Sequence, residues 1–250
     1  MALSITFIVP AYNEEHNIAA TVQTISRAME GRQADYELIL VDDASQDHTG
    51  VIIDELAATS PRLRAVHNAI NLNLGGAYKR GLELAAKEHV IMLPGDNGYD
   101  IHSIGQVLDG IGDADILIPY PTNTDEVRTR FRALASRGFT ALINTLFGLK
   151  VRYYNGPVVH RTALLRTITI RTNSFAYQAE ALVRMLACGY SYAECPVQTQ
   201  FRAGGRSSAL KLKNQITVLW TILQLLLSVG PRCAFVAKVG RPSSRRLAER

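Results

Sequence analysis

Short apolar runs alternate with amphipathic stretches through the first hundred residues. Runs that are apolar on both faces are typical of parallel strands covered by helices on each side. The predicted strands are 4–10, 36–41, 63–67 and 89–93, and the predicted helices are one between Asn13 and Glu30, one at 49–58 and one at 77–87. Regular alternation of strands and helices with short connections predicts an α/β fold, with a doubly wound, mostly parallel sheet that suits a nucleotide.

The second half of the chain has a less regular pattern. Residues 114–119 and 157–160 are predicted strands, and a polar turn with a long amphipathic segment covers 122–150. Core-spaced apolar residues predict a helix from Phe175 to Cys188. Residues 209–229 form a further helical pattern whose apolar block, Ile216 to Val229, is about 14 residues long, too short for a membrane span.

Charge is unevenly distributed along the 250 residues, whose formal net charge is +5. From Arg202 onward the chain has ten Lys and Arg residues and one acid, Glu249. A basic tail favours an anionic membrane surface or phosphate-rich ligands. We expect no nucleic-acid partner, because no nucleic-acid-binding motif is present. Three cysteines without C-x-x-C spacing and the absence of a signal peptide fit a cytoplasmic, reducing compartment.

Carboxylates follow two of the predicted strands. Asp42 and Asp43 come directly after 36–41, and Asp96 and Asp100 follow 89–93 through a Pro-Gly turn. In open α/β sheets, ligands bind at the carboxyl ends of the strands. Paired carboxylates there can accept hydrogen bonds from a base or a ribose. The alternative is that these residues only form turns and helix caps, with Asn13, Ser45 and Asp47 as the expected caps.

A glycine pair, Gly75-Gly76, precedes the third predicted helix. Glycines at a helix start permit close approach of the backbone to a ligand. Lys79 or Arg80, one turn later, is then suited to face a phosphate. The alternative is an ordinary loop between a strand and a helix.

Four segments together resemble the family 2 glycosyltransferases, in particular the polyprenyl-phosphate glycosyltransferases that include dolichyl-phosphate mannose synthase. The resemblance covers about residues 4–210 and implies the GT-A (Rossmann-like) fold, with 211–250 as a separate amphipathic helix and basic tail. The segments are Ile8-Val9-Pro10-Ala11-Tyr12-Asn13-Glu14-Glu15, Val41-Asp42-Asp43-Ala44-Ser45, Asn73-Leu74-Gly75-Gly76-Ala77 and Gly95-Asp96-Asn97-Gly98-Tyr99-Asp100.

The resemblance also implies a nucleotide-sugar site. Asp96 matches the last Asp of the family's metal motif, so it and Asp100 are the expected ligands of Mg²⁺ or Mn²⁺, although Pro94 replaces the motif's first Asp. Arg202 is the expected clamp on the diphosphate, and Arg206 stands in for a lysine that Ser208 replaces. The remaining donor contacts implied are Pro10, Tyr12, Glu14, Asp42, Asp43, Gly75 and Lys79.

An acceptor site is implied on the amphipathic segment and beyond it. The resemblance places a lipid phosphate near Ser136-Arg137-Gly138, and arginine suits this task because its planar fork binds phosphate oxygens. The alternative is a surface helix with solvated arginines. Glu180 either faces the acceptor, where it acts as a base for a hydroxyl, or pairs with Arg184 on its own helix. The acceptor residues implied are Arg130, Arg132, Ser136, Arg137, Glu180 and Ser207.

These observations predict an inverting glycosyltransferase that moves a sugar from a nucleotide-diphosphate sugar to a polyprenyl phosphate or another membrane-associated acceptor. Asp96, Glu180 and Arg202 are the expected catalytic residues. Residues 209–250 are expected to contact the inner face of the membrane, with packing on the sheet or on a second copy of the chain as alternatives. A transferase acting on a soluble glycan or small hydroxyl acceptor, and a catalytically silent nucleotide-sugar binding module, are the other functions left open.

Overall fold

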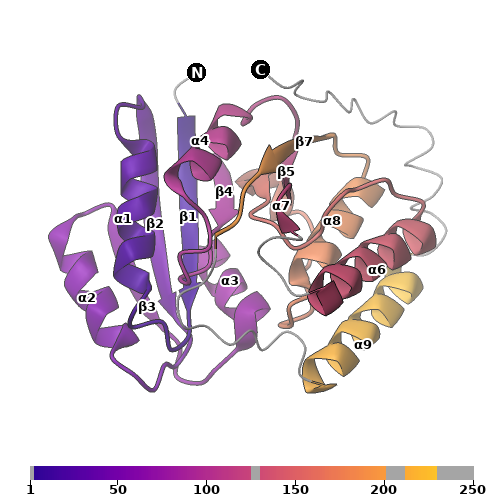
Figure 1. Cartoon of the computed structure of the whole chain (residues 1–250), viewed down its shortest axis with the longest axis horizontal. Coiled ribbons are helices and arrows are strands. Elements are labelled where there is room, and N and C mark those ends of the chain that lie inside the picture. Colours follow the sequence, from indigo (N-terminus) through magenta and orange to yellow (C-terminus); the bar gives the residue numbers. More distant parts are fainter. Residues whose placement is uncertain (1–2, 125–129, 201–211, 230–250) are drawn as a thin grey trace.

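The computed structural model describes residues 3–124, 130–200 and 212–229. The described strands form one sheet in the order β3-β2-β1-β4-β6-β5-β7 (Figure 1). Strand β6 runs antiparallel to both neighbours, and the other pairs are parallel. The strands are β1 (Leu3–Ala11), β2 (Ala34–Asp42), β3 (Leu63–His67), β4 (His89–Met92), β5 (Ile116–Pro121), β6 (Val159–Arg161) and β7 (Tyr192–Val197).

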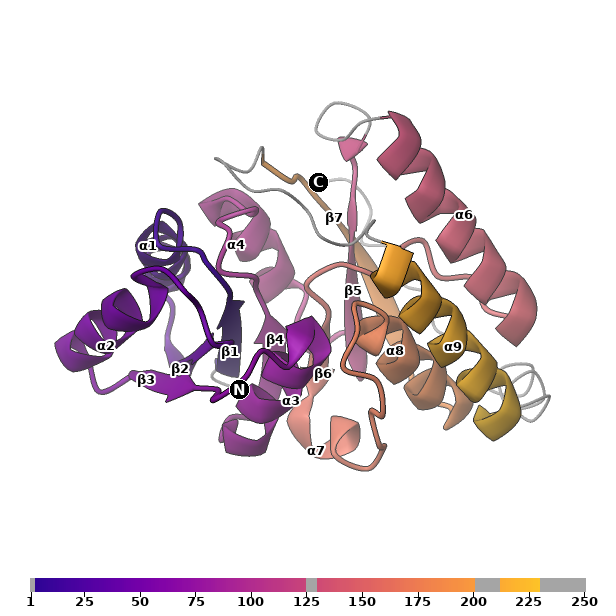
Figure 2. The ribbon, with the colours of Figure 1, turned by 90° about the horizontal axis from the view of Figure 1, so that it is seen from below.

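Helices cover both faces of this sheet, as the apolar runs predicted (Figure 2). Alternate residues of β1 face two separate cores: Phe7 and Val9 pack with α1, α2 and α4, whereas Ile8 packs with α3, α6, α8 and α9. The helices are α1 (Ile18–Met29), α2 (Thr49–Thr59), α3 (Asn73–Leu84), α4 (Ile101–Asp109), α6 (Arg130–Phe147), α7 (Thr162–Leu165), α8 (Tyr177–Ala187) and α9 (Leu212–Val229). Helices α4 and α7 were not predicted. The domain boundary predicted at 210 lies outside the described residues, and it stays a prediction.

Two predicted features near the helix starts are wrong. Asn13 does not cap α1, which begins after Asn17; it has a left-handed backbone (φ 55°), and its Oδ1 accepts a hydrogen bond from the Gln46 amide at 2.8 Å. Helix α3 begins at Asn73 rather than at 77, so the glycine pair lies inside its first turn. A Cβ at Gly75 would lie 2.8 Å from the carbonyl carbon of Asn173. The close approach that this glycine permits is to the chain's own backbone.

Residues 170–174, which we call the junction segment, are held from two sides. The Lys79 ammonium donates to the carbonyl oxygens of Ile170 and Arg171, each at 3.3 Å. One oxygen of Glu180 accepts the amides of Arg171 and Thr172 at 3.0 and 2.9 Å. Burial lowers the pKa of the Lys79 ammonium, although the charge of Glu180 opposes this shift. The Lys79 ammonium thus contacts the main chain of the junction segment. Its predicted contact with a phosphate stays a prediction.

The other oxygen of Glu180 binds Arg184, as the alternative interpretation of this residue expected. The Arg184 Nε donates to it at 2.9 Å, and Nη2 lies 2.8 Å away. Glu180 is not an exposed helix acid, since it is only 2% exposed. Its carboxylate forms a buried ion pair and accepts two backbone amides, so it holds the junction segment in place. The predicted catalytic role of Glu180 has no support in this geometry.

We expect Glu180→Ala to lower the free energy of unfolding by about 3–5 kcal/mol, because it leaves the Arg184 guanidinium buried without its partner. Urea denaturation followed by circular dichroism measures the loss.

The matched control is Glu83→Ala, which removes the exposed pair of Glu83 with Arg80 on α3. A surface pair of this kind is worth less than about 1 kcal/mol. Equal losses in the two variants would contradict a stabilising role for the buried pair.

Candidate functional site

Six of the predicted donor residues lie at one edge of the sheet, where β1, β2, β3 and β4 end: Pro10, Tyr12, Glu14, Asp42, Asp43 and Asp96. Strand β1 pairs in parallel with β2 and β4, so the turns after these strands lie next to one another. The carbonyl of Ala11 accepts the Asp43 amide at 2.9 Å, and the carbonyl of Pro10 accepts the Gly95 amide at 3.0 Å. The end of β1 therefore connects both acidic turns through its own backbone.

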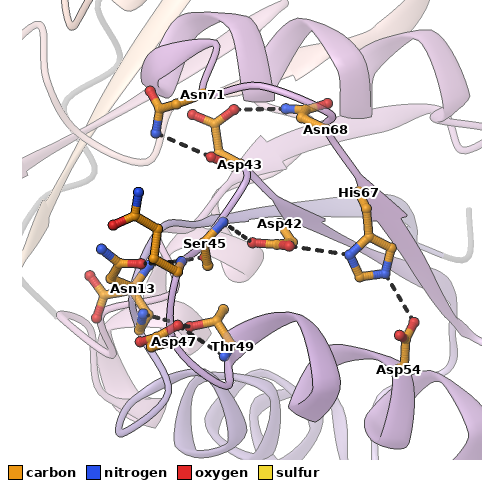
Figure 3. A network of polar contacts seen from close by, with 12 residues as sticks. Asn13, Asp42, Asp43, Ser45, Asp47, Thr49, Asp54, His67, Asn68 and Asn71 are labelled. Carbon is orange, nitrogen blue, oxygen red and sulfur yellow. Dashed lines mark hydrogen bonds and ion pairs between the residues drawn. The ribbon is translucent and has the colours of Figure 1, made fainter.

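Asp42 and Asp43 are both buried, and each is held by a different set of partners (Figure 3). Oδ1 of Asp43 accepts hydrogen bonds from Asn68 Nδ2 and from the Leu72 amide, each at 2.8 Å. Burial raises the pKa of Asp43, and these two hydrogen bonds oppose the shift. Oδ1 of Asp42 accepts the Ser45 amide at 3.0 Å. These contacts fix the carboxylates in the turn that the resemblance assigns to the nucleoside.

The turn after β1 is linked to the turn after β2. The Asn13 amide donates to Ser45 Oγ at 3.0 Å, and the Glu14 amide donates to Thr49 Oγ1 at 2.8 Å. The Glu14 carboxylate accepts a hydrogen bond from Asn17 at 2.8 Å, while the Tyr12 side chain is 44% exposed at the same edge. Their contacts with a base or ribose stay predictions, and the location of both residues fits that role.

Asp96 lies in a tight turn directly after β4. It is 7% exposed, and its Oδ1 accepts the Gly98 amide at 3.1 Å. Asn97 has a left-handed backbone (φ 49°) that α1 holds in place, since its amide donates to Thr21 Oγ1 at 3.0 Å and its Oδ1 accepts from Thr24 at 3.1 Å. Thus α1 holds the residue that follows Asp96 in this turn.

Asp100 has a defined structural role, because it caps α4. Its Oδ1 accepts the Ser103 amide at 2.6 Å. Among the residues that the structure describes, no group of three or more His, Cys, Asp or Glu side chains is placed to hold a metal ion. Carboxylate oxygens still fit Mg²⁺ or Mn²⁺, since such ions are commonly bound by one or two carboxylates together with substrate phosphates and water. Asp96 and Asp100 as metal ligands stay predictions.

The predicted acceptor residues lie elsewhere. Ser136 and Arg132 are half-buried on α6 and Arg137 is exposed there, and α6 lies on the side of the molecule away from α1 and α2 (Figure 1). The side chain of Arg130 lies outside the described residues, as do Arg202, Arg206 and Ser207. The structure therefore brings together the nucleoside-binding and metal-binding candidates, whereas Arg132, Ser136 and Arg137 lie on α6 and Glu180 lies on α8.

Sequence reasoning missed three kinds of supporting residue at this edge. His67 and Asn68 contact Asp42 and Asp43, and Thr21 and Thr24 contact Asn97. The sequence could have indicated His67 and Asn68, because they lie at the end of the predicted strand 63–67, just as Asp42 and Asp43 lie at the end of the strand before it. The threonines left no such signal, since they lie within an ordinary amphipathic helix.

Similar sequences are found among glycosyltransferases. The chain is 25% identical over 248 residues to glycosyltransferase AglD of Haloferax volcanii, a match that spans 94% of this chain and 40% of that protein. It is 24% identical to polyprenol monophosphomannose synthase of Mycolicibacterium smegmatis, spanning 76% of this chain and 75% of the relative. It is 23% identical to undecaprenyl-phosphate mannosyltransferase of Micrococcus luteus, spanning 80% and 85%.

The fold is also found among solved structures. Glucosyl-3-phosphoglycerate synthase from Mycobacterium tuberculosis, crystallised with Mg²⁺ and uridine diphosphate, superposes with a TM-score of 0.68 at 17% identity, covering 93% of this chain and 80% of that one. The model of the family described as "Glycosyl transferase family 2" matches residues 6–168, which include every turn of the acidic edge. Since this match spans more than half of the chain, the protein belongs to glycosyl transferase family 2, and its sheet and flanking helices form the expected GT-A fold.

Proposed function

We propose that this protein transfers a sugar from a nucleotide-diphosphate sugar to a polyprenyl phosphate, with inversion at the anomeric carbon. The observation that carries the proposal is the match of the family model to the segment that holds Asp42, Asp43 and Asp96 at one sheet edge. Two relatives support the polyprenyl acceptor: a polyprenol monophosphomannose synthase and an undecaprenyl-phosphate mannosyltransferase. This chain covers 75% of the first and 85% of the second.

In the proposed mechanism the donor lies along the acidic edge. The turn of Asp42 and Asp43 receives the nucleoside, and Asp96 would hold Mg²⁺ or Mn²⁺. Such an ion, when bound, would supply positive charge to stabilise the leaving nucleoside diphosphate. The Gly98 amide and the contacts of Asn97 with α1 keep the Asp96 carboxylate at that position. Arg202 and Arg206 remain the proposed partners of the leaving group.

A phosphate acceptor fits this structure better than a hydroxyl acceptor does. A hydroxyl needs a base to remove its proton, whereas a phosphate is already ionised at neutral pH. Glu180, the base expected for a hydroxyl, has both of its oxygens engaged by Arg184 and by two backbone amides. We therefore place the acceptor phosphate with the arginines of α6 and assign no proton transfer to Glu180.

A membrane surface is the partner that we propose for α6 and α9. The two helices lie side by side (Figures 1 and 2), and neither contains an Asp or Glu. One side of α9 packs into the core through Ile222 and Leu225. Within the described part of the chain, no helix is long and apolar enough to cross a membrane. The exposed large apolar side chains of the two helices are Phe131, Leu134, Leu142, Leu146, Ile216, Leu219, Trp220, Leu223 and Leu227.

Apolar and cationic residues together are typical of helices that lie in the headgroup region of an anionic leaflet. Such a surface would bring the enzyme to a lipid-linked acceptor. We therefore propose that the protein lies on the inner face of the membrane. The proposal rests on the apolar and cationic residues of α6 and α9 and on the basic tail.

We expect donor binding to require both the metal and Asp96. Titration calorimetry with UDP-, GDP- and dTDP-sugars should show binding by the wild type to one of them in the presence of Mn²⁺. Asp96→Asn should weaken that binding at least tenfold, or about 1.4 kcal/mol.

The matched control is Asp109→Asn, an exposed acid on α4 that pairs with Arg32. This variant should bind the donor as the wild type does. If no nucleotide sugar bound the wild type, the transferase proposal would be wrong; unchanged binding by Asp96→Asn would remove only the metal role.

We expect the double variant Leu219→Ser, Trp220→Ser to bind vesicles of anionic phospholipid at least tenfold more weakly than the wild type. Each large apolar side chain that leaves water contributes about 1.5–3 kcal/mol. Vesicle flotation measures the bound fraction, and Val51→Ser on α2, where Val51 is 58% exposed, is the control. If both variants floated like the wild type while Leu219→Ser, Trp220→Ser changed the sedimentation of the free protein, this face would instead be an interface between copies of the chain.

A further inference from the structure

The imidazole of His67 lies between two carboxylates at the edge of the sheet (Figure 3). His67 is the last residue of β3, and the parallel register places it opposite Asp42 on β2. Its Nδ1 is 3.2 Å from Asp42 Oδ2, and its Nε2 is 3.0 Å from Oδ1 of Asp54 on α2. Each ring nitrogen therefore has its own carboxylate partner, from a different element.

This geometry selects one protonation state of the ring. A neutral imidazole has one N–H and can donate to only one of two facing acceptors, whereas the imidazolium donates to both. Burial by itself lowers the pKa of His67, but the hydrogen bonds to Asp54 and Asp42 outweigh it and leave the pKa raised above the usual 6.5. Strand β3 is at the edge of the sheet, and Asp42 and Asp54 are the titratable groups that β2 and α2 direct at the ring.

We propose that His67, as an imidazolium, is a positioning residue for Asp42 and makes the binding of the nucleotide donor depend on pH. The proposal rests on the proposed function, because Asp42 belongs to the turn assigned to the nucleoside. His67 touches neither the donor nor the reacting atoms; it acts through Asp42.

The contacts of Asp42 show how the effect would be transmitted. Its Oδ1 accepts the Ser45 amide and so fixes the start of the turn, while its Oδ2 faces His67. A Cβ at Gly50 would lie 3.0 Å from that Oδ2, so the carboxylate uses space that a glycine at this position leaves open. When the ring loses a proton, an unprotonated nitrogen faces one of the carboxylate oxygens and repels it. Asp42 also loses the positive charge of the imidazolium, which offsets the repulsion between the adjacent carboxylates of Asp42 and Asp43.

The sign of the pH effect follows from the direction of the shift. Because the folded state raises the pKa of His67, the contribution of these ion pairs is complete below the ordinary histidine pKa and is lost as pH rises through the raised value. Donor affinity should fall over the same range. His67 and Asp54 side chains are 42% and 66% exposed, so solvent protons reach the pair directly.

The protonation state is tested by NMR of the full chain. We expect the imidazole of His67 to be protonated on both nitrogens at pH 6 and to titrate with a midpoint above 6.5. Asp54→Asn should lower this midpoint, since it removes one of the two carboxylates. A midpoint at or below 6.5, or a ring with one protonated nitrogen at pH 6, would overturn the proposal.

The positioning role is tested by calorimetry with UDP-glucose and GDP-mannose in Mn²⁺ between pH 6 and 8, where neither diphosphate diester titrates. The wild type should bind its donor at least threefold more weakly at pH 8 than at pH 6. His67→Gln, which keeps a neutral donor, should show weaker binding that no longer changes with pH. His102→Gln, an exposed histidine on α4, should keep the wild-type profile.

A pH profile of His67→Gln equal to that of the wild type would overturn the positioning role. If the wild type bound neither of these two nor any dTDP-sugar at any pH, the proposed function and this role would fall together. The NMR titration would then still report whether the ring is charged between its two carboxylates, so the two failures are distinguishable.

Discussion

Two backbone hydrogen bonds at the end of β1 fix the geometry on which the candidate site depends. The carbonyls of Pro10 and Ala11 accept the amides of Gly95 and Asp43, which open the turns after β4 and β2. Parallel pairing makes this possible, because the carboxyl ends of parallel strands meet at the same edge. The acids that follow β2 and β4 therefore share one location, although more than 50 residues separate them in sequence.

Concentrating carboxylates at one edge has an energetic cost, which the surrounding turns offset. Backbone amides of Ser45, Leu72 and Gly98 donate to Asp42, Asp43 and Asp96 respectively. Hydrogen bonds from amides favour the charged form of a carboxylate, whereas burial opposes it. The His67 ring adds a group that can be cationic to this set. At Asp43 burial outweighs these hydrogen bonds and raises the pKa. The amide contacts thus hold the three carboxylates in a fixed alignment at this edge.

The junction segment connects the donor half of the molecule to the helices that face the proposed membrane. Gly75 and Lys79 of α3 contact its backbone from one side, and Glu180 of α8 contacts it from another. The Thr221 hydroxyl of α9 donates to Thr172 Oγ1 at 3.0 Å within the core. The contacts of Thr172 are buried, and through the junction segment α3, α8 and α9 are joined to one another. Gly75, Lys79 and Glu180, which the sequence analysis assigned to ligands, contact the junction segment in this structure.

The sequence by itself determined the α/β architecture, the first four strands and the family, because apolar runs and strand-end motifs are local signals. It also placed Asp42, Asp43 and Asp96 correctly at strand ends. Only the tertiary structure decided what Lys79, Gly75 and Glu180 contact, and it revealed His67 and Thr21 as supports. Those outcomes depend on which distant segment lies against each side chain. A lysine one turn into a helix gives the same sequence pattern whether a phosphate or a carbonyl faces it, because only the packed fold brings that neighbour into contact.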